Sequence, residues 1–596
     1  MYNLRFLLCG RYLFPWFGFN ASEFTCANLG IKGDSFNVLL PRRKFMSVRN
    51  AFALFIALST LALLVGCGGG SSSPPPVPPP NGGFSNSNLS GTYVFSVSGT
   101  DVNNDPVQIV GSFTANGSGG NGKGGITGGT LDIADPGFEA LKTPVAPVLT
   151  NSPIASSSSY TVSVDGRGQA TLVTSTPFGD IILDFVLSSS SHGLVTEFDG
   201  NASGSGTLDL QSTATLAGAY AFSLSGSDGS SGYPLATVGA FTVGSGGTIA
   251  GAEDFNDANL AYPNEALLGT VALGPSSTPS TTLETSFTSS VAGGPLTFDV
   301  YAIDSTHLKF IETDAFEFLA GDAYSQPSAT VSSGSLAFTL AGFFPFSPTN
   351  PTPVAAGGFM VANGGNITTA STEDVNEDGS TSTAPINFSA TYSNTGSQIP
   401  GRFTLTDFSN FFGGTQYAAY PSSGGLLLLE IDDSGLMVGA AYPPQSSTAF
   451  TPPQGFGLNF TGINLTDEVE VDDIAEFATA STGGTFTGLV DENFAPGGAP
   501  ITPPQVLDGT FTAPDANGRG SLITTTLNNT LNGGLGITFY SVDGTTFPFV
   551  ETDTGGQVST GVFVLQNAND PSPAARSHMF VPQRLIRGKA ARQKNK

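Results

Sequence analysis

The chain has 596 residues, and at about 150 residues per domain this length predicts roughly four domains. Charged residues make up only 11% of it, and it contains 77 glycines and 40 prolines, a composition that excludes a coiled coil or a helical bundle. The formal net charge of −27 disfavours nucleic-acid binding, because a phosphate polymer would be repelled. The hydrophobic content of 39%, with 46 phenylalanines, argues against disorder throughout.

The N-terminal region has the pattern of an export signal. The only long apolar run, 51–65, follows a basic segment that ends at Arg49, and it stops at Leu64-Val65-Gly66-Cys67. With about 15 residues the run is too short for an ordinary membrane-spanning helix and is typical of a secretory signal. The tetrapeptide resembles the lipobox of bacterial lipoproteins, which implies cleavage before Cys67 and diacylation of this cysteine. A plain signal peptide with an incidental cysteine is the alternative.

Three segments precede the folded part. Met46 begins a short segment that contains Arg49 and leads directly into the apolar run, as the N-terminal region of a signal peptide does. We therefore interpret 1–45 as an over-long gene start and 46–66 as the signal peptide. Residues 67–85 are the lipidated cysteine and a Gly/Ser/Pro tether. Cys67 is then the only thiol of the mature chain, which excludes disulfides. The resemblance to lipoprotein sorting, with Gly68 after the cysteine, implies an outer-membrane lipid anchor that faces the periplasm or the cell exterior.

One apolar segment occurs four times, as Tyr93–Gly99, Tyr220–Gly226, Leu336–Gly342 and Phe456–Gly462. The period of about 120 residues is too long for a solenoid unit, so each copy is expected to be a domain. The predicted domains are 86–214, 215–332, 333–452 and 453–570. A basic tail, 571–596, follows; it has no acidic residue and is predicted to be disordered.

Within each copy, apolar residues alternate with small polar ones, as Tyr93, Phe95 and Val97 do. This period of two predicts half-buried strands, about eight in each copy, separated by Ser, Gly and Asp clusters. The predicted fold class is all-β, with four tandem antiparallel meander domains. A β-barrel is favoured over a β-sandwich, because the strands follow one another as hairpins and glycines interrupt them where a small barrel must bend.

Two resemblances accompany this pattern. The domains resemble calycin or lipocalin-like meander barrels in shape only. The region 89–566 resembles a family of tandem-repeat, all-β surface lipoproteins of environmental Gram-negative bacteria, through elements that the first copy carries as Gly91-Thr92-Tyr93, Gly111-Ser112-Phe113-Thr114, Asp165-Gly166-Arg167-Gly168 and Leu210-Gln211. This resemblance implies a surface lipoprotein and supplies no biochemical activity.

A pair of acidic residues recurs near the end of each copy. The pairs are Glu197 and Asp199, Glu312 and Asp314, Glu430 and Asp432, and Glu551 and Asp553. Carboxylates two residues apart on a strand lie about 7 Å apart, within the range used in glycoside hydrolysis. Because Ile311, Leu429 and Val550 precede the glutamates, we expect the apolar residues to point inward and the acids to face solvent, in a structural role.

Acidic loops in the middle of each copy are candidates for a metal site. In the third copy Asp374, Asn376 and Asp378 alternate and are followed by Gly379, which is the spacing of the first half of a calcium loop. The twelfth-position glutamate is absent, so the loop is not an EF-hand. A weak Ca²⁺ site and a plain Asn/Asp turn are both open at this point. His192 and His307 occupy matching positions in two copies, and we interpret them as turn residues of separate domains.

Two functions from different classes follow. The first is an outer-membrane-anchored lipoprotein with a structural or binding role toward a polysaccharide, a surface or a small ligand. The second is a secreted hydrolase that uses the strand-borne Glu/Asp pairs. Repetition favours the first, because tandem copies multiply weak contacts whereas catalysis gains little from four degenerate sites. No nucleic-acid partner is expected, and the oligomeric state stays open.

Overall fold

A computed structural model describes residues 83–570, apart from 120–121, 142–144, 213–215, 259, 274–281, 290–293, 315, 348–350, 397–400, 413–414, 467, 496–499, 503, 525–534 and 555. These residues form four antiparallel sheets within one compact unit. Two short 3₁₀ helices, η1 (Asn86–Asn88) and η2 (Pro136–Ala140), are the helical elements of the described part. The predicted all-β fold class is therefore confirmed.

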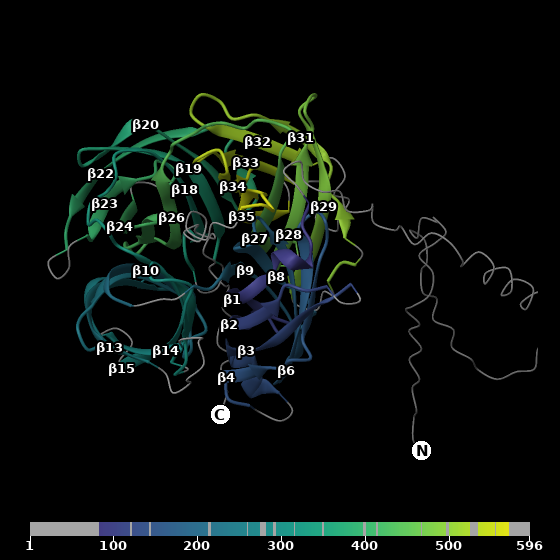
Figure 1. Cartoon of the computed structure of the whole chain (residues 1–596). Helices are drawn as coiled ribbons and strands as arrows, with labels where there is room; N and C mark the ends of the chain where they lie inside the picture. Colours follow the sequence, from purple (N-terminus) through teal and green to yellow (C-terminus); the bar gives the residue numbers. More distant parts are fainter. Residues whose placement is uncertain are drawn as a thin grey trace, which may run out of the picture. The chain divides into compact units, whose positions relative to one another are not determined.

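The first two sheets take up the first two copies of the repeat (Figure 1). The strands of the first are β1 (Ser90–Asp101), β2 (Pro106–Asn116), β3 (Gly124–Ala134), β4 (Val148–Ile154), β5 (Ser159–Val162), β6 (Arg167–Thr176), β7 (Gly179–Leu187), β8 (His192–Glu197) and β9 (Ala202–Leu210). The strands of the second are β10 (Gly218–Asp228), β11 (Pro234–Val243), β12 (Thr248–Asp257), β13 (Leu260–Leu273), β14 (Thr282–Ser289), β15 (Gly294–Ala302), β16 (His307–Glu312) and β17 (Glu317–Ser325).

The last two sheets take up the third and fourth copies. The strands of the third are β18 (Gly334–Phe343), β19 (Pro353–Asn363), β20 (Asn366–Glu377), β21 (Ser380–Thr381), β22 (Ile386–Asn394), β23 (Phe403–Phe408), β24 (Thr415–Ser422), β25 (Gly425–Glu430) and β26 (Leu436–Pro444). The strands of the fourth are β27 (Gly455–Asn464), β28 (Val469–Thr479), β29 (Thr485–Ala495), β30 (Gln505–Val506), β31 (Gly509–Thr512), β32 (Arg519–Thr524), β33 (Gly536–Tyr540), β34 (Thr546–Glu551) and β35 (Gln557–Leu565).

Each sheet closes on itself. The second is a closed barrel of β10 to β17 in chain order, drawn in teal in Figure 1. In the other three, the second strand also pairs with the third, through β2–β3, β19–β20 and β28–β29, and this pairing closes a ring of eight strands. The ninth strand of these sheets, β4, β21 or β30, pairs only with the third strand of its ring. The predicted eight-stranded meander barrels are confirmed.

The alternating apolar residues fill the barrel interiors. The fourth barrel, for example, encloses a cluster of phenylalanines that includes Phe456, Phe477, Phe539 and Phe563. The glycine that closes the repeated segment allows two strands to approach closely: a Cβ on Gly99 would lie 1.7 Å from the carbonyl oxygen of Ser203 on β9. The interiors are therefore packed cores, and the positions available for chemistry lie on the outer faces and between barrels.

Candidate functional site

The acidic loops singled out in the sequence lie at contacts between successive barrels, which we call seams. In the seam between the second and third barrels, Asp254 on β12 is completely buried. Arg402 donates to both of its carboxylate oxygens, from Nε at 2.9 Å and from Nη2 at 2.5 Å. Tyr420 on β24 donates its hydroxyl to the same carboxylate at 2.5 Å. Such a charge-assisted, bidentate arrangement fixes the orientation of the two barrels as well as their distance.

The seam between the third and fourth barrels repeats this arrangement. Asp374 on β20 accepts hydrogen bonds from Arg519 Nε at 2.9 Å and from Arg519 Nη2 at 2.7 Å. Tyr540 on β33 donates to Asp374 Oδ2 at 2.7 Å. Arg519 and Tyr540 are paired neighbours on β32 and β33, so the two donors reach the aspartate from one place on the next barrel.

The other two seams each keep one of the two donors. Between the first and second barrels Asp132 accepts the hydroxyl of Tyr301 from across the seam, at 2.5 Å. Between the fourth barrel and the first, Asp491 accepts a hydrogen bond from Arg167 Nη1 at 3.0 Å. This seam has no tyrosine at the equivalent position: the strand partner of Arg167 is Val186, whereas that of Arg519 is Tyr540. The fourth barrel thus contacts the first with the same motif that joins consecutive barrels, and the seams form a closed circuit.

An asparagine two residues after the aspartate makes the second contact of three seams. Asn256 Nδ2 donates to the carbonyl oxygens of Glu430 and Gly435, both at 2.9 Å. In the same way, Asn376 Nδ2 donates to the carbonyl oxygens of Glu551 and Gln557. Asn493 Nδ2 donates to those of Glu197 and Ala202. These carbonyls flank the loop between the last two strands of the next barrel. The repeated Asp-x-Asn element and the repeated Glu-x-Asp element therefore meet across each of these seams.

A glutamine that directly follows each barrel's last strand makes the third contact. Gln211 Nε2 donates to the carbonyl oxygen of Ala302 at 2.7 Å, and Gln326 Nε2 donates to that of Pro421 at 2.9 Å. Gln445 donates in the same way to Ser541 at 2.8 Å, and Gln566 to Asp165 at 2.8 Å. The last of these links the end of the described chain to the first barrel. Each barrel therefore contacts the next through its third strand and through its end.

Apolar residues on the outer strand faces complete the seams. Between the fourth and first barrels, Ile474, Val562 and Val564 pack against Val186 and Leu194. A corresponding cluster joins the first barrel to the second, with Val94 and Val110 on one side and Tyr301, Ile311 and Phe318 on the other. Burial of these side chains provides stabilisation, while the aspartate contacts fix the register.

The buried seam tyrosines act as hydrogen-bond donors at any ordinary pH. Burial, and then the adjacent aspartate, raises the pKa of Tyr301, Tyr420 and Tyr540 well above its usual value. Asp132 faces no arginine, and burial raises its pKa to about 6, even though the Tyr301 hydroxyl opposes the shift.

The residues proposed for calcium do not fit a calcium site. Both carboxylate oxygens of Asp374 are held by Arg519 and Tyr540, and the side-chain amide of Asn376 donates to carbonyl oxygens of the fourth barrel. Asp378 has a positive φ of 48° in the turn that follows. Within the described part of the chain, no group of three or more His, Cys, Asp or Glu residues is arranged to hold a metal ion. The oxygen-rich loop is used to join two barrels.

The expectation that the glutamates of the acidic pairs face solvent is wrong. Glu312 and Glu430 are 0% exposed, and Glu197 and Glu551 are also buried. Each lies on the inner side of its barrel: Phe310, two residues before Glu312, belongs to the core of the second barrel, while Ile311 faces the first barrel. The outer face of this strand is apolar because it is buried in a seam. The sequence pattern therefore led us to assign the outer face as the inner one.

Both members of each pair have structural partners. Glu312 accepts the backbone N–H groups of Glu317 and Leu319 at 2.9 and 3.3 Å. Asp432 accepts the N–H groups of Gln416 at 2.7 Å and Ser434 at 3.0 Å, so it braces the loop that follows β25. Burial, and then the charge of Asp432, raises the pKa of Glu430 to about 9. A carboxyl enclosed in this way has no path to a substrate.

The two histidines predicted to be turn residues of separate domains lie in one buried cluster. His192 Nδ1 is 2.7 Å from Asp209 Oδ1, and His307 Nε2 is 2.7 Å from Asp322 Oδ1. Burial disfavours ionisation of Asp209, but the charges of His192, Lys309 and His307 outweigh it and lower its pKa. Because Lys309 and His307 belong to the second barrel, this cluster crosses the first seam.

Sequence reasoning missed the seams, although one signal in the sequence pointed to them. The Gly-Arg turn occurs in the first, third and fourth copies and is missing from the second. The first copy, whose aspartate contacts the second, has Ala134 where the other three copies have an asparagine. Two elements that are lost in neighbouring copies together indicate a contact between those copies. Between Cys67 and Asp570 the chain has six basic residues, and four of them, Arg167, Lys309, Arg402 and Arg519, lie at seams.

Several predicted features lie outside the described residues. These are the over-long start, the signal peptide, Cys67 with its tether as far as residue 82, and the basic tail. In the part of the chain that the structure does describe, no helix has the length and apolar character needed to cross a membrane.

The fold and the seams together define a chain of eight-stranded antiparallel barrels joined in a closed circuit. No family model matches the chain, and no curated protein matches it. Among solved structures, it is similar to the vaccine antigen transferrin-binding protein B of Haemophilus parasuis, at 9% identity over 63% of this chain and 83% of that one, with a TM-score of 0.17. A putative AttH protein of Nitrosomonas europaea matches at 10% identity, over 41% of this chain and 96% of that one, with a TM-score of 0.15.

Proposed function

We propose that this chain is an outer-membrane lipoprotein with a structural or binding role, anchored through acylated Cys67 and facing the periplasm or the cell exterior. The observation that carries the proposal is the seam between the fourth barrel and the first. It makes the four copies one body, because Arg167 and Asp491 join copies that are far apart in the sequence. A ligand or a surface then meets a fixed combination of barrels rather than four independent domains.

The two ends of the described chain support a single point of attachment. Asn88 Nδ2 donates to the carbonyl oxygen of Ala568 at 3.0 Å, and Phe84 and Ala568 share the core cluster of the first barrel. Phe84 lies at the C-terminal end of the predicted tether, 67–85. In this proposal one lipidated tether holds the whole body at the membrane, and the partner is a polysaccharide, a surface or a small ligand.

A secreted hydrolase is the weaker alternative, because the repeated acids are used elsewhere. Each glutamate of the acidic pairs is buried inside a barrel, and the aspartates of the acidic loops are held in seams. Glycoside hydrolysis needs two carboxyl groups that reach a sugar from opposite sides. The buried glutamates and the seam aspartates do not have that access.

The test is expression from Met46 with mass measurement of the N-terminal peptide and fractionation of the cells. We expect a diacylated Cys67 at the N-terminus and a membrane-bound protein, and a Cys67→Ser variant that is released from the membrane. A matched Ser71→Ala variant in the tether should remain bound. Treatment of intact cells with protease then separates a surface location from a periplasmic one. A Cys67→Ser protein that stays in the outer-membrane fraction would overturn the proposed anchor.

A further inference from the structure

The third barrel has a pocket at the end where the chain enters it, which we call the mouth of the barrel. The pocket has a volume of about 600 Å³ and is partly open to solvent. Its lining comes from the entering segment, 327–332, from the starts of β18 and β25, and from the end of β26. Leu336 and Leu426 belong both to this lining and to the core of the third barrel. The pocket therefore adjoins the packed core.

The mouth of the fourth barrel is closed by phenyl rings instead. Phe450, in the segment that enters this barrel, is 9% exposed and stacks on Phe456, with ring centroids 5.5 Å apart. Phe547 meets both rings edge-on, with its centroid 5.6 Å from that of Phe450 and 5.7 Å from that of Phe456. The three rings together fill the mouth of the fourth barrel.

Two of these three rings are replaced by leucines in the third barrel. Leu336 is the first residue of the repeated segment, as Phe456 is in the fourth copy. Leu426 is the second residue of β25, as Phe547 is of β34, and both strands end at a buried glutamate. Both leucines line the pocket. Because leucine is smaller than phenylalanine, the mouth is wider in the third barrel than in the fourth.

The third ring has no counterpart in the segment that enters the third barrel. Val331 of this segment packs against the core of the third barrel, as Phe450 does in the fourth and Phe84 does in the first. The segment 327–332 contains no aromatic residue, and Val331 lines the pocket. The pocket therefore lies at the place where a phenyl ring of the chain itself closes the fourth barrel.

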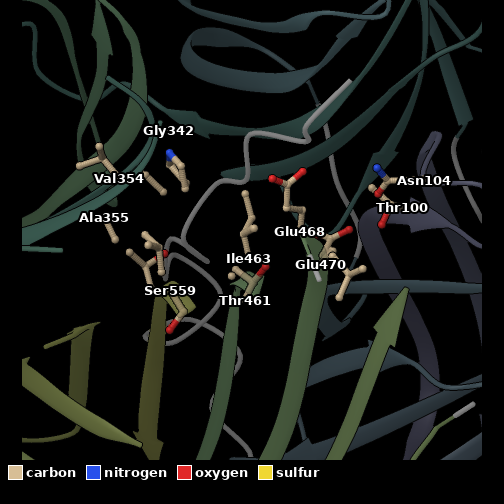
Figure 2. Close-up of a pocket in the computed structure, with 16 residues that line it drawn as sticks. Thr100, Asn104, Gly342, Val354, Ala355, Thr461, Ile463, Glu468, Glu470 and Ser559 are labelled. Atoms are coloured by element: carbon tan, nitrogen blue, oxygen red, sulfur yellow. The ribbon is translucent and has the colours of Figure 1, made fainter. Parts of the chain in front are cut away.

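The lining of the mouth favours a neutral, apolar ligand. Its polar residues are serines and a threonine, and none of the described residues that line it carries a charge. The pocket between the first, third and fourth barrels differs in this respect, because Glu468 and Glu470 line it (Figure 2). Burial of a charged ligand without a partner is costly. Four prolines add to the apolar lining of the mouth, namely Pro327, Pro421, Pro443 and Pro444.

We propose that the mouth of the third barrel binds a neutral molecule with a phenyl ring, and that the ring lies between Val331, Leu336 and Leu426. The inference deepens the proposed binding role by naming a ligand class, and it rests on that role. Burial of the apolar surface of the ring provides the affinity. Apolar cavities of proteins bind small aromatic molecules in this way.

The probe for the test is benzyl alcohol, titrated into the full chain purified in detergent and followed by ligand-detected NMR. Detergent alone is the blank, because micelles take up the alcohol without saturating. We expect saturable binding with a Kd on the order of 10⁻³ M, which suits a ligand of this size. Benzoate, which has the same ring and a negative charge, should bind at least about tenfold more weakly. The absence of saturable binding of benzyl alcohol, or equal binding of benzoate, would overturn the proposal.

Variants locate the site in the third barrel. Val331→Phe gives the entering segment a ring of its own, so it should weaken binding about tenfold and raise the melting temperature. Leu426→Phe supplies the ring that Phe547 provides in the fourth barrel, and it should weaken binding by a similar factor. Val102→Phe is the matched control: it adds a ring at an exposed position that does not line the pocket, so it should bind as the parent does.

The fourth barrel provides the converse test. Phe450→Ala removes the ring that closes its mouth, so this variant should give about twice the saturating signal of the parent. An unchanged signal from the folded Phe450→Ala protein would contradict the equivalence of the two mouths, on which the proposal rests.

Thermal melting of each variant confirms that it is folded. A folded Val331→Phe protein that binds benzyl alcohol like the parent would contradict the site, and Leu426→Phe provides the same test if the first variant does not fold. Because lipidation of Cys67 is measured separately, loss of ring binding and loss of membrane anchoring are distinguishable outcomes.

Discussion

Arg167 in the first barrel donates from Nη1 to Asp491 Oδ2 in the fourth at 3.0 Å, although the two residues are 324 positions apart in the chain. Both side chains are about nine-tenths buried. A contact of this kind, equivalent to the Arg402–Asp254 contact between consecutive barrels, makes the last copy a neighbour of the first. The repeated Asp–Arg contact therefore joins the last barrel to the first as well as consecutive barrels. Its contribution to the free energy of unfolding can be measured separately at each seam.

The buried pair Arg402 and Asp254 should be strongly coupled. Arg402→Gln leaves a completely buried carboxylate without its cation, so we expect a loss of about 3 kcal/mol in the free energy of unfolding. Arg519→Gln should cost about 1 kcal/mol, because that arginine side chain is 30% exposed and solvent screens its pair. Denaturant unfolding measures both values. The Arg402→Gln/Asp254→Asn double variant should cost less than the sum of the single changes, and strict additivity would show that the pair does not interact.

The protein should be more stable at pH 5 than at pH 9. The pKa of Glu430 is raised to about 9, and burial also raises those of Asp135, Glu317 and Glu476 to about 8. A folded pKa above the unfolded one means that the folded state holds the proton more tightly, so this stabilisation is complete below about pH 4 and is lost as the pH rises through about 8 to 9. Thermal melting across this range measures the trend.

The contribution of one group to that pH dependence can be isolated. A Glu430→Gln protein keeps a neutral side chain at every pH, so its melting temperature should fall less between pH 5 and pH 9 than that of the parent. Asp180→Asn, at an exposed position, should follow the parent curve. A parent protein whose melting temperature is flat or rises over this interval would contradict the burial of neutral carboxyl groups.

Calcium should have no specific effect on the third barrel. The Asp374 carboxylate accepts hydrogen bonds from Arg519 and the Asn376 amide donates to the fourth barrel, so millimolar calcium chloride should raise the melting temperature no more than sodium chloride of equal ionic strength does. Asp374→Asn should lower the melting temperature equally in calcium and in chelator, because it weakens a seam rather than a metal site. A stabilisation that only calcium gives, and that Asp374→Asn removes, would restore the calcium interpretation.

The first barrel should fold when 86–214 is excised. Its eight-stranded ring is closed by the β2–β3 pairing, and its core cluster includes Phe95, Phe113 and Phe185. Excision exposes the seam residues Val94 and Val186, so we expect a cooperatively melting all-β domain that self-associates. Circular dichroism and sedimentation measure the two properties. A molten product would mean that the seams are required for the barrel itself.

The sequence predicted the barrels and not the seams for a physical reason. Alternation reports which residues share a face of a strand, and it identifies the inner face only when the outer face is polar. In β16, Phe310 and Glu312 point inward while Ile311 is buried in a seam, so both faces contain apolar residues and the face was misjudged. Likewise, an outward aspartate such as Asp254 takes the same place in the alternating sequence whether its carboxylate contacts water or an arginine of the next barrel.

The closed circuit predicts that the chain tolerates a new start between the first and second barrels. Phe84 and Ala568 already lie in one core cluster, and Asn88 donates to the carbonyl oxygen of Ala568, so a short Gly/Ser linker can join the end of the described chain to its beginning. A permuted chain that begins near Leu216 and ends near Ser212 keeps all the strands intact.

We expect the permuted protein to melt cooperatively and within about 5 °C of the parent, since the only covalent link removed is one between barrels that remain joined by a seam. A second permuted chain, opened between Asp184 and Phe185 within β7, is the matched control and should be strongly destabilised because it breaks the ring of the first barrel. If the Leu216 start unfolds as completely as the β7 start, the fourth barrel does not hold the first in place, and the closed circuit is not the stable arrangement of the chain.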